Sequence, residues 1–414
     1  MRISTSQQYE RSVRAMLDQQ AQVARTQAQI SSGQRIEVPS DDPAGARRIL
    51  ALQEEITGLE QYQRNGDAAA ARLGLAETAI DSTVDVLQRV RELALSANSA
   101  VLSDSDRAAI AVEMRARVDE LLGIANTRDA GGDYLFSGYR TETAPFSRSP
   151  AGPVVYWGDQ GRRELQIGPR DKIALVDSGS AVFGAIPNGN GSFVVQSGSN
   201  IGSGVIDPGV VTDPGVWQAS ADIYTLSFVT NAAGELAYQV SGASVGQVLP
   251  PLPAVAPADA PAYVAGADIE FGGVRVAVTG APAVGDSFTL QPSAQRDLFE
   301  TLDRLVAALE APAGTAPARA DFANALNRGL SEVDQALDHL AVEQSELGAR
   351  LNLLDSHREL NQDLLLRSRK LLSDTADLDL AEAITRFNRE QAALSAAQQA
   401  YVRVQGLSLF DYLK

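Results

Sequence analysis

Residues 9–30 read YERSVRAMLDQQAQVARTQAQI, and residues 380–405 read LAEAITRFNREQAALSAAQQAYVRVQ. Both stretches follow a heptad count that steps 4-3-4-3, with one apolar column and a second column that turns to glutamine. The first stretch gives Tyr9, Val13, Met16, Gln20, Val23, Gln27 and Ile30, and the second gives Leu380, Ile384, Phe387, Gln391, Leu394, Gln398 and Tyr401. Each end is therefore a helix with half of the apolar stripe that a stable coiled coil needs.

The glutamines stand where a self-sufficient pair of helices would carry leucine. Buried glutamine must be hydrogen-bonded, and an assembly of many helices can arrange this better than one isolated pair. A helix of this length is also only marginally stable alone in water. We therefore predict that both ends are mobile in the isolated protein and gain order on assembly.

Proline divides the chain into three parts. Fourteen of the 18 prolines lie between Pro145 and Pro292, and proline is excluded from helix interiors, so the flanks can form long helices and the middle cannot. The predicted fold class is α+β, with a discontinuous long-helix coiled-coil bundle formed by both termini and an inserted β-rich middle domain. The expected domains are terminal helices at 1–40 and 375–414, an inner helical bundle at 41–145 and 293–374, and an outer β-rich domain at 146–292.

Inside the flanks, apolar columns and capping residues predict longer helices. The columns are Leu73, Ala76, Ile80, Thr83, Leu87, Val90 and Ala94 in one flank, and Val333, Leu337, Leu340, Gln344, Leu347, Leu351 and Leu354 in the other. We expect these columns to pack within their own domain. Helices should begin near Pro43 and near Asp104, where Ser103 and Asp106 form a capping-box variant. An interruption is expected at 373–377.

The middle part has the alternation and turns of β-strands. Residues 223–230 alternate in polarity and return after Asn231 as a predicted hairpin, and further short strands are expected around residues 269–278 and 288–290. Both tryptophans, Trp157 and Trp217, are expected in this β core. The proline-rich segment 250–261 should be an extended loop.

Composition excludes several classes of function. A net charge of −17 argues against nucleic-acid binding, and the absence of cysteine excludes disulfides and thiolate metal sites. The two histidines, His339 and His357, are expected on a helix surface. No apolar run is long enough to insert into a membrane, and the amino terminus has no apolar core of the kind a cleaved secretory signal has.

One string could suggest an enzyme. Residues 242–246 read GASVG, which matches the G-x-S-x-G pattern of a nucleophile elbow. That elbow needs a helix directly after the serine, whereas the next residues are QVLPP, so we predict a turn. The acidic clusters are explained by helix capping. The sequence therefore predicts no enzyme, no catalytic residues, no metal and no cofactor.

Several strings give the chain a specific resemblance. They are MRIST at 1–5, SSGQR at 31–35, PSDDPAG at 39–45, YLFSGYRTETAPF at 134–146 and QGLSLFDYL at 405–413. Together with the paired terminal helices they resemble the flagellin superfamily. The string at 134–146 and the terminal residues Leu409 and Phe410 favour the hook-associated protein 3 family, the hook-filament junction proteins, over flagellin. The resemblance covers about residues 1–146 and 293–414.

The resemblance implies a structural role outside the cell. It implies export through the flagellar type III apparatus without a cleaved signal, with a chaperone on the carboxyl-terminal helix. The implied partners are hook-associated protein 1, flagellin and identical copies in a ring, and the apolar and glutamine columns, with Leu409 and Phe410, would be the assembly interface. A flagellin-type filament subunit, or a secreted coiled-coil adhesin or binding module, remain alternatives.

Overall fold

The computed structural model describes residues 5–99, 102–150 and 152–411, without the side chains of residues 5, 6, 8 and 404–411. The chain forms two compact units. The first contains Met1–Gly66, Ile167–Arg170 and Asp355–Lys414, and the second contains Asp67–Gln166 and Asp171–Leu354. Each unit is therefore built from segments that lie far apart in the sequence.

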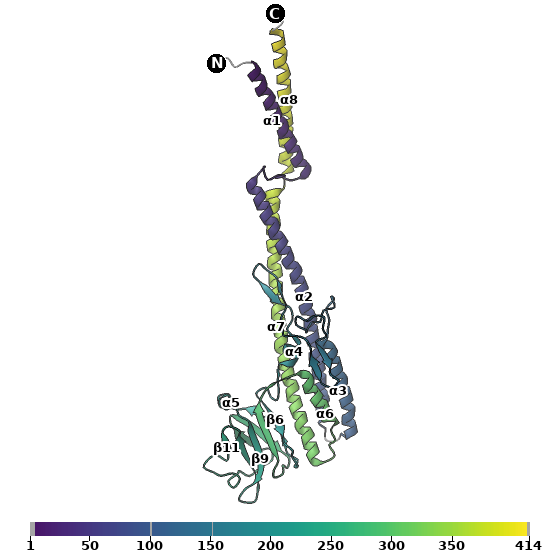
Figure 1. Ribbon diagram of the computed structural model, residues 1–414, viewed down its shortest axis with the longest axis vertical. Coiled ribbons are helices and arrows are strands. Elements are labelled where there is room, and N and C mark those ends of the chain that lie inside the picture. The colour runs from purple at the N-terminus through teal and green to yellow at the C-terminus, as the bar shows by residue number, and fades with distance from the viewer. Residues whose placement is uncertain (1–4, 100–101, 151, 412–414) are drawn as a thin grey trace. The chain divides into compact units, whose positions relative to one another are not determined.

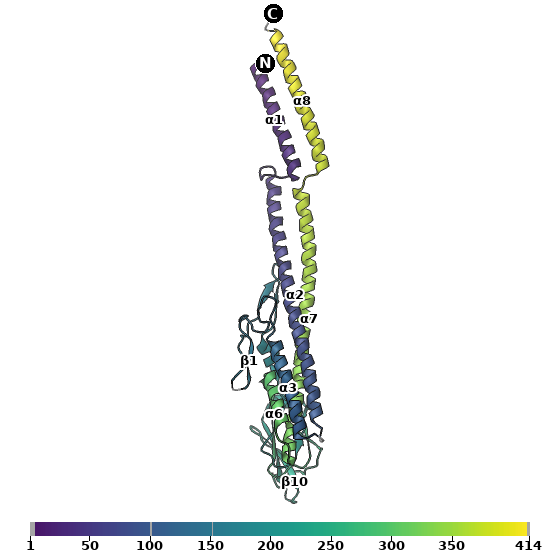
Figure 2. The same cartoon turned by 90° about the vertical axis from the view of Figure 1, so that its right-hand side faces the viewer.

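Four helices contribute to the first unit. They are α1 (Thr5–Ser32), the first part of α2 (Pro43–Ala97), the last part of α7 (Ala316–Ala376) and α8 (Leu380–Asp411). Helices α1 and α8 lie side by side and run antiparallel in both views (Figures 1 and 2). Helix α2 begins at Pro43, as predicted, because the Asp42 carboxylate accepts hydrogen bonds from the Ala44 and Gly45 amides at 3.1 and 2.9 Å.

The predicted interruption at 373–377 is wrong in its position. Helix α7 continues to Ala376, and the break is confined to the residues between it and Leu380. Two hydrogen bonds hold the last turn of α7: the Thr375 hydroxyl donates to the Leu371 carbonyl at 2.7 Å, and the Asp377 amide donates to the Ser373 carbonyl at 2.9 Å. The polar residues close the helix end instead of breaking it.

The second unit contains a helical part. Its helices are the remainder of α2 and α7 together with α3 (Asp104–Ala125), α4 (Gly179–Gly184), α5 (Pro214–Ser220) and α6 (Leu298–Glu310). All seven residues of the predicted column from Leu73 to Ala94 are buried, at 0–1% exposure. The capping box of Ser103 and Asp106 is present at the start of α3. The sequence prediction for this flank is confirmed.

An aromatic cluster joins α4 and α6 to the segment that follows α3. Phe183 lies 5.2, 5.6 and 6.4 Å, between ring centroids, from Phe136, Phe146 and Phe299, and all four rings are buried. The second unit also contains short antiparallel strand pairs. These are β1 (Phe146–Arg148) with β2 (Val154–Tyr156), β3 (Glu164–Gln166) with β4 (Lys172–Ala174), and β5 (Ile186–Pro187) with β15 (Gln295–Arg296).

Two antiparallel sheets form the β part of the second unit. One has the strand order β11-β10-β9-β14-β6 and the other β12-β13-β7, with β8 also paired to β13. The strands are β6 (Phe193–Ser197), β7 (Val205–Ile206), β8 (Val210–Val211), β9 (Tyr224–Thr230), β10 (Leu236–Gly242), β11 (Gly246–Leu249), β12 (Asp268–Phe271), β13 (Val274–Thr279) and β14 (Ser287–Pro292). The predicted hairpin is the β9-β10 pair. Its inward residues Tyr224, Leu226 and Phe228 alternate with more exposed neighbours, as the period of a strand requires.

The expectation that both tryptophans lie in the β core is half wrong. Trp217 is 7% exposed and packs in the core, with its ring centroid 5.5 Å from that of Phe193. Trp157 lies beside the β1-β2 pair, is 53% exposed and donates its indole N–H to the Ser147 hydroxyl at 2.9 Å. Composition alone could not separate a core tryptophan from one on a small hairpin.

Asp297, the residue directly before α6, is expected to make the stability of the protein depend on pH. The Asp297 carboxylate accepts hydrogen bonds from the Phe299 and Glu300 amides, but burial and the charges of Glu300 and Asp303 raise its pKa from 3.8 to about 6. Because the folded protein holds this proton more tightly than the unfolded chain, this group makes the protein less stable as the pH rises from about 4 through 6. Asp297→Asn keeps the acceptor oxygen and removes the charge.

We expect Asp297→Asn to stabilise the protein at pH 8, by at most about 3 kcal/mol. The gain should shrink at pH 5, where the wild-type carboxyl is protonated for much of the time. Urea unfolding at the two pH values measures this difference. An equal effect at pH 5 and pH 8 would contradict the assignment.

Candidate assembly interface

Helices α1 and α8 pack through the apolar columns predicted from the sequence. The rings of Tyr9 and Tyr401 lie 5.6 Å apart, and a hydrogen bond between the two hydroxyl groups raises the pKa of Tyr401. Six further apolar residues of the heptad count are half-buried: Val13, Met16, Val23 and Ile30 in α1, and Phe387 and Leu394 in α8. Leu380 is 51% exposed. One apolar column from each helix therefore supplies most of the contact.

The second column is shifted by one residue from the predicted one. Gln20 and Gln27 are exposed, and the Gln19 and Thr26 side chains reach α8 instead. The Thr26 hydroxyl donates to the Glu390 carboxylate at 2.7 Å.

The same shift occurs in α8, where Ile384, Gln391 and Gln398 are exposed. Their preceding residues Ala383, Glu390 and Ala397 are turned inward instead. A small or hydrogen-bonding residue in this column lets the two helices approach without burying an unpaired amide. Within one chain the glutamines face away from the partner helix, and their predicted place in an interface between subunits stays a prediction.

The side chains of two predicted interface residues lie outside the part that the structure describes. The structure gives no side-chain description for Leu409 and Phe410, nor for Gln405. Among the side chains that are described, only Thr26 is fully buried in α1 and only Ala383 in α8. The pair thus buries little apolar surface, which is the main source of stability in a helix pair.

The outer faces of the pair carry apolar residues that the heptad count missed. These are Leu17 and Val402, which are 60% and 66% exposed; Tyr9 and Ile384, which the count includes, are about half exposed. Leu17 follows Met16 and Val402 follows Tyr401, so in both helices an apolar residue comes directly after a column residue. Two apolar residues in succession indicate an apolar helix face that is wider than one column.

The two chain connections next to the terminal pair are joined to each other. The Arg35 amide donates to the Ala376 carbonyl at 2.7 Å, and the Leu378 amide donates to the Gly33 carbonyl at 2.9 Å. The Arg35 guanidinium also donates to the Thr375 carbonyl at 2.8 Å. Gly33 has a φ of +72°, a conformation that favours glycine. This accounts for the glycine and arginine of the string at 31–35.

The segment 242–246 is a turn between β10 and β11, as predicted. The amides of Ser244 and Val245 donate to the Asp222 carboxylate at 2.9 and 3.1 Å, and a strand follows the serine. His339 is half-buried, not fully on the surface, and its Nε2 lies 3.0 Å from the Ala181 carbonyl. The described residues contain no group of three or more side chains suited to a metal ion. Nor does any described helix have the length and apolarity to cross a membrane.

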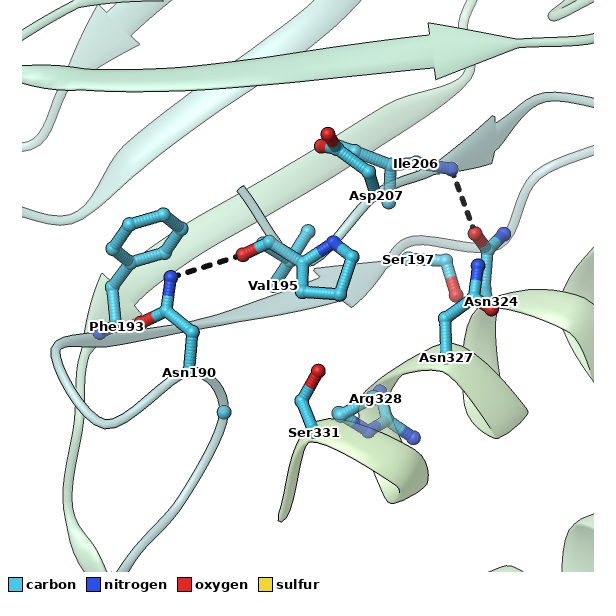
Figure 3. A pocket seen from close by; sticks show the side chains of 12 residues that line it. Asn190, Phe193, Val195, Ser197, Ile206, Asp207, Asn324, Asn327, Arg328 and Ser331 are labelled. Atoms are coloured by element: carbon cyan, nitrogen blue, oxygen red, sulfur yellow. Dashed lines mark hydrogen bonds between the residues drawn. The ribbon is translucent and has the colours of Figure 1, made fainter. Parts of the chain in front are cut away.

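A small pocket lies where the β part meets α7 (Figure 3). Asn324 accepts a hydrogen bond from the Ile206 amide at 2.9 Å, and Asn190 donates to the Pro208 carbonyl at 3.1 Å. The cavity measures about 20 Å³, close to the space that one water molecule needs. It is therefore a packing gap between the β part and α7, and it is too small for an organic ligand.

The known proteins that the chain resembles in sequence are flagellar proteins. A family model described as bacterial flagellin N-terminal helical region matches residues 3–141. The flagellar hook-associated protein 3 of Escherichia coli K12 is 26% identical, with 100% of each chain covered. The B-type flagellin of Pseudomonas aeruginosa is 36% identical, but over only 26% of this chain and 22% of that protein.

A solved structure extends this result to three dimensions. The crystal structure of flagellar hook associated protein-3 from Legionella pneumophila matches with a TM-score of 0.75 and 36% identity. The match covers 79% of this chain and 98% of the Legionella chain. With this identity over nearly the whole of that relative, the chain belongs to the flagellar hook-associated protein 3 family.

Proposed function

We propose that the protein is a structural adaptor of the bacterial flagellum, which joins the hook to the flagellin filament through assembly of its terminal helices. The observation that carries this proposal is the α1/α8 pair, which buries little of its own surface and exposes apolar side chains on its outer faces. Exposed apolar surface of this kind marks an interaction site. Neighbouring subunits would cover it and so order both ends of the chain.

The partners in this proposal lie on both sides of a ring of identical subunits. Hook-associated protein 1 would contact the ring from the hook, and the first flagellin subunits would contact it from the filament. Before assembly the chain would leave the cell unfolded through the type III apparatus, without a cleaved signal, and a chaperone would cover α8. The absence of cysteine supports this route because no disulfide can form to obstruct unfolding.

A filament subunit of flagellin type is the second candidate, favoured by the match of residues 3–141 to the flagellin amino-terminal region. The two candidates differ in growth. Purified flagellin adds to seeds without limit, whereas an adaptor should add one short layer to hooks that carry hook-associated protein 1.

Gene deletion tests the adaptor role in the bacterium that makes the protein. We expect the deletion strain to make hooks, to release flagellin monomers into the medium and to lack filaments, and we expect the plasmid-borne gene to restore filaments. Electron microscopy and immunoblots of the medium measure these results. Normal filaments on the deletion strain would refute the adaptor role.

A further inference from the structure

The first unit contains a charged hollow beside the terminal helix pair. It measures about 470 Å³ and is lined by the carboxyl-terminal half of α1, the connection before α2, and α8. Three arginines, Arg25, Arg35 and Arg386, line it together with three carboxylates, Asp41, Asp42 and Glu390. The formal charges cancel, so the free donors and acceptors decide what the hollow can bind.

All three carboxylates accept hydrogen bonds from other groups of the same chain. Asp42 accepts from the first amides of α2, and Asp41 accepts from the Glu37 and Val38 amides at 3.3 and 3.2 Å. Glu390 accepts from the Thr26 hydroxyl. These oxygens therefore shape the walls of the hollow and hold its loop in place.

Two of the arginines keep unused donors. The Nε of Arg386 is buried and has no hydrogen-bond partner, and this side chain forms no ion pair among the described residues. The Arg25 side chain is 70% exposed, with its Nε 4.0 Å from Asp41, at the limit of an ion pair. A buried guanidinium N–H without an acceptor is costly, and a carboxylate is the group that matches the guanidinium fork.

We propose that Arg25 and Arg386 receive a carboxylate from the terminal helices of an adjacent copy of this chain. The proposal rests on the proposed function, because only assembly brings a second copy to this position. The chain supplies suitable groups: Glu10 and Asp18 on α1 and Glu382 on α8 form no side-chain hydrogen bond or ion pair within the described residues. The chain is also acidic, with 52 carboxylates against 35 lysines and arginines, so arginines with free donors are attractive positions for a neighbouring copy.

The test is the double variant Arg25→Gln/Arg386→Gln. The matched control is Arg14→Gln/Arg403→Gln, which removes two exposed arginines from the same two helices and changes the net charge equally. We expect both proteins to be exported and to melt like the wild type. Incorporation at the hook end should fall roughly tenfold or more for the double variant alone, because two charge-assisted hydrogen bonds are lost.

The occupant is identified by crosslinking and calorimetry. A photo-crosslinking residue in place of Gln22, which lines the hollow, should join a second copy of the chain within α1 or α8. Crosslinks to another protein, or binding of inorganic phosphate or acetate by the isolated wild-type protein at micromolar concentration, would overturn the assignment to a second copy. Equal incorporation of the double variant and its control would overturn the site itself. Failure of the wild type to reach the hook end would instead refute the proposed function.

Discussion

Deletion of residues 1–32, or of residues 378–414, is expected to abolish incorporation at the hook end completely. Each deletion removes one partner of the α1/α8 pair, so the remaining helix loses the column that half-buries its apolar residues. A lone helix of this length has too little stability to persist in water. The assembly surface would then be lost from both ends of the chain at once.

The rest of the protein should remain folded in both truncated forms. Its core lies in the second unit, where the column from Leu73 to Ala94 and the aromatic cluster around Phe183 are buried without help from α1 or α8. Circular dichroism and thermal melting should show this. Exchanging residues 251–257 for a Gly-Ser linker is a control, since Leu252 is 76% exposed, and this variant should incorporate normally. A truncated protein that still incorporates would refute the mechanism.

Phe183→Ala is expected to cost about 3–5 kcal/mol of unfolding free energy in the second unit. The ring is fully buried on a helix of six residues, and three other rings surround it. Removing it leaves a cavity that a short helix held between Phe136, Phe146 and Phe299 cannot close. The midpoint of thermal unfolding should fall by about 10 °C.

Chemical unfolding followed by circular dichroism measures this cost. Phe183→Leu, which keeps most of the volume, should lose much less stability, and Leu252→Ala on an exposed loop should change it by less than about 0.5 kcal/mol. A loss from Phe183→Ala no larger than that from Leu252→Ala would show that the cluster does not hold the unit together.

The sequence was most informative where one period governs a long segment. The column from Leu73 to Ala94 and the starts of α2 and α3 are found where the periodicity and the caps of Ser103 and Asp42 place them. A long helix repeats the same signal many times, so single exceptions do not shift it.

The terminal pair shows the limit of that approach. The heptad count includes Tyr9, Phe387 and Tyr401, which lie in the contact between α1 and α8, whereas its glutamine column lies outside that contact. The Thr26–Glu390 hydrogen bond and the small size of Ala383 select the face that turns inward, and a heptad count of apolar residues reads neither of them. Contacts between segments that lie far apart in the sequence produce no periodic pattern in either segment. The unpaired N–H of Arg386 could not be predicted from the sequence either, because it depends on which carboxylates already accept hydrogen bonds from other groups.

In the proposed function, neighbouring subunits complete the terminal pair. Amide hydrogen exchange of residues 9–30 and 380–403, compared between the isolated protein and the protein assembled on hooks, tests it most directly. We expect fast exchange in the isolated protein and protection on the order of 100-fold greater after assembly. Slow exchange throughout both segments of the isolated protein would contradict the claim.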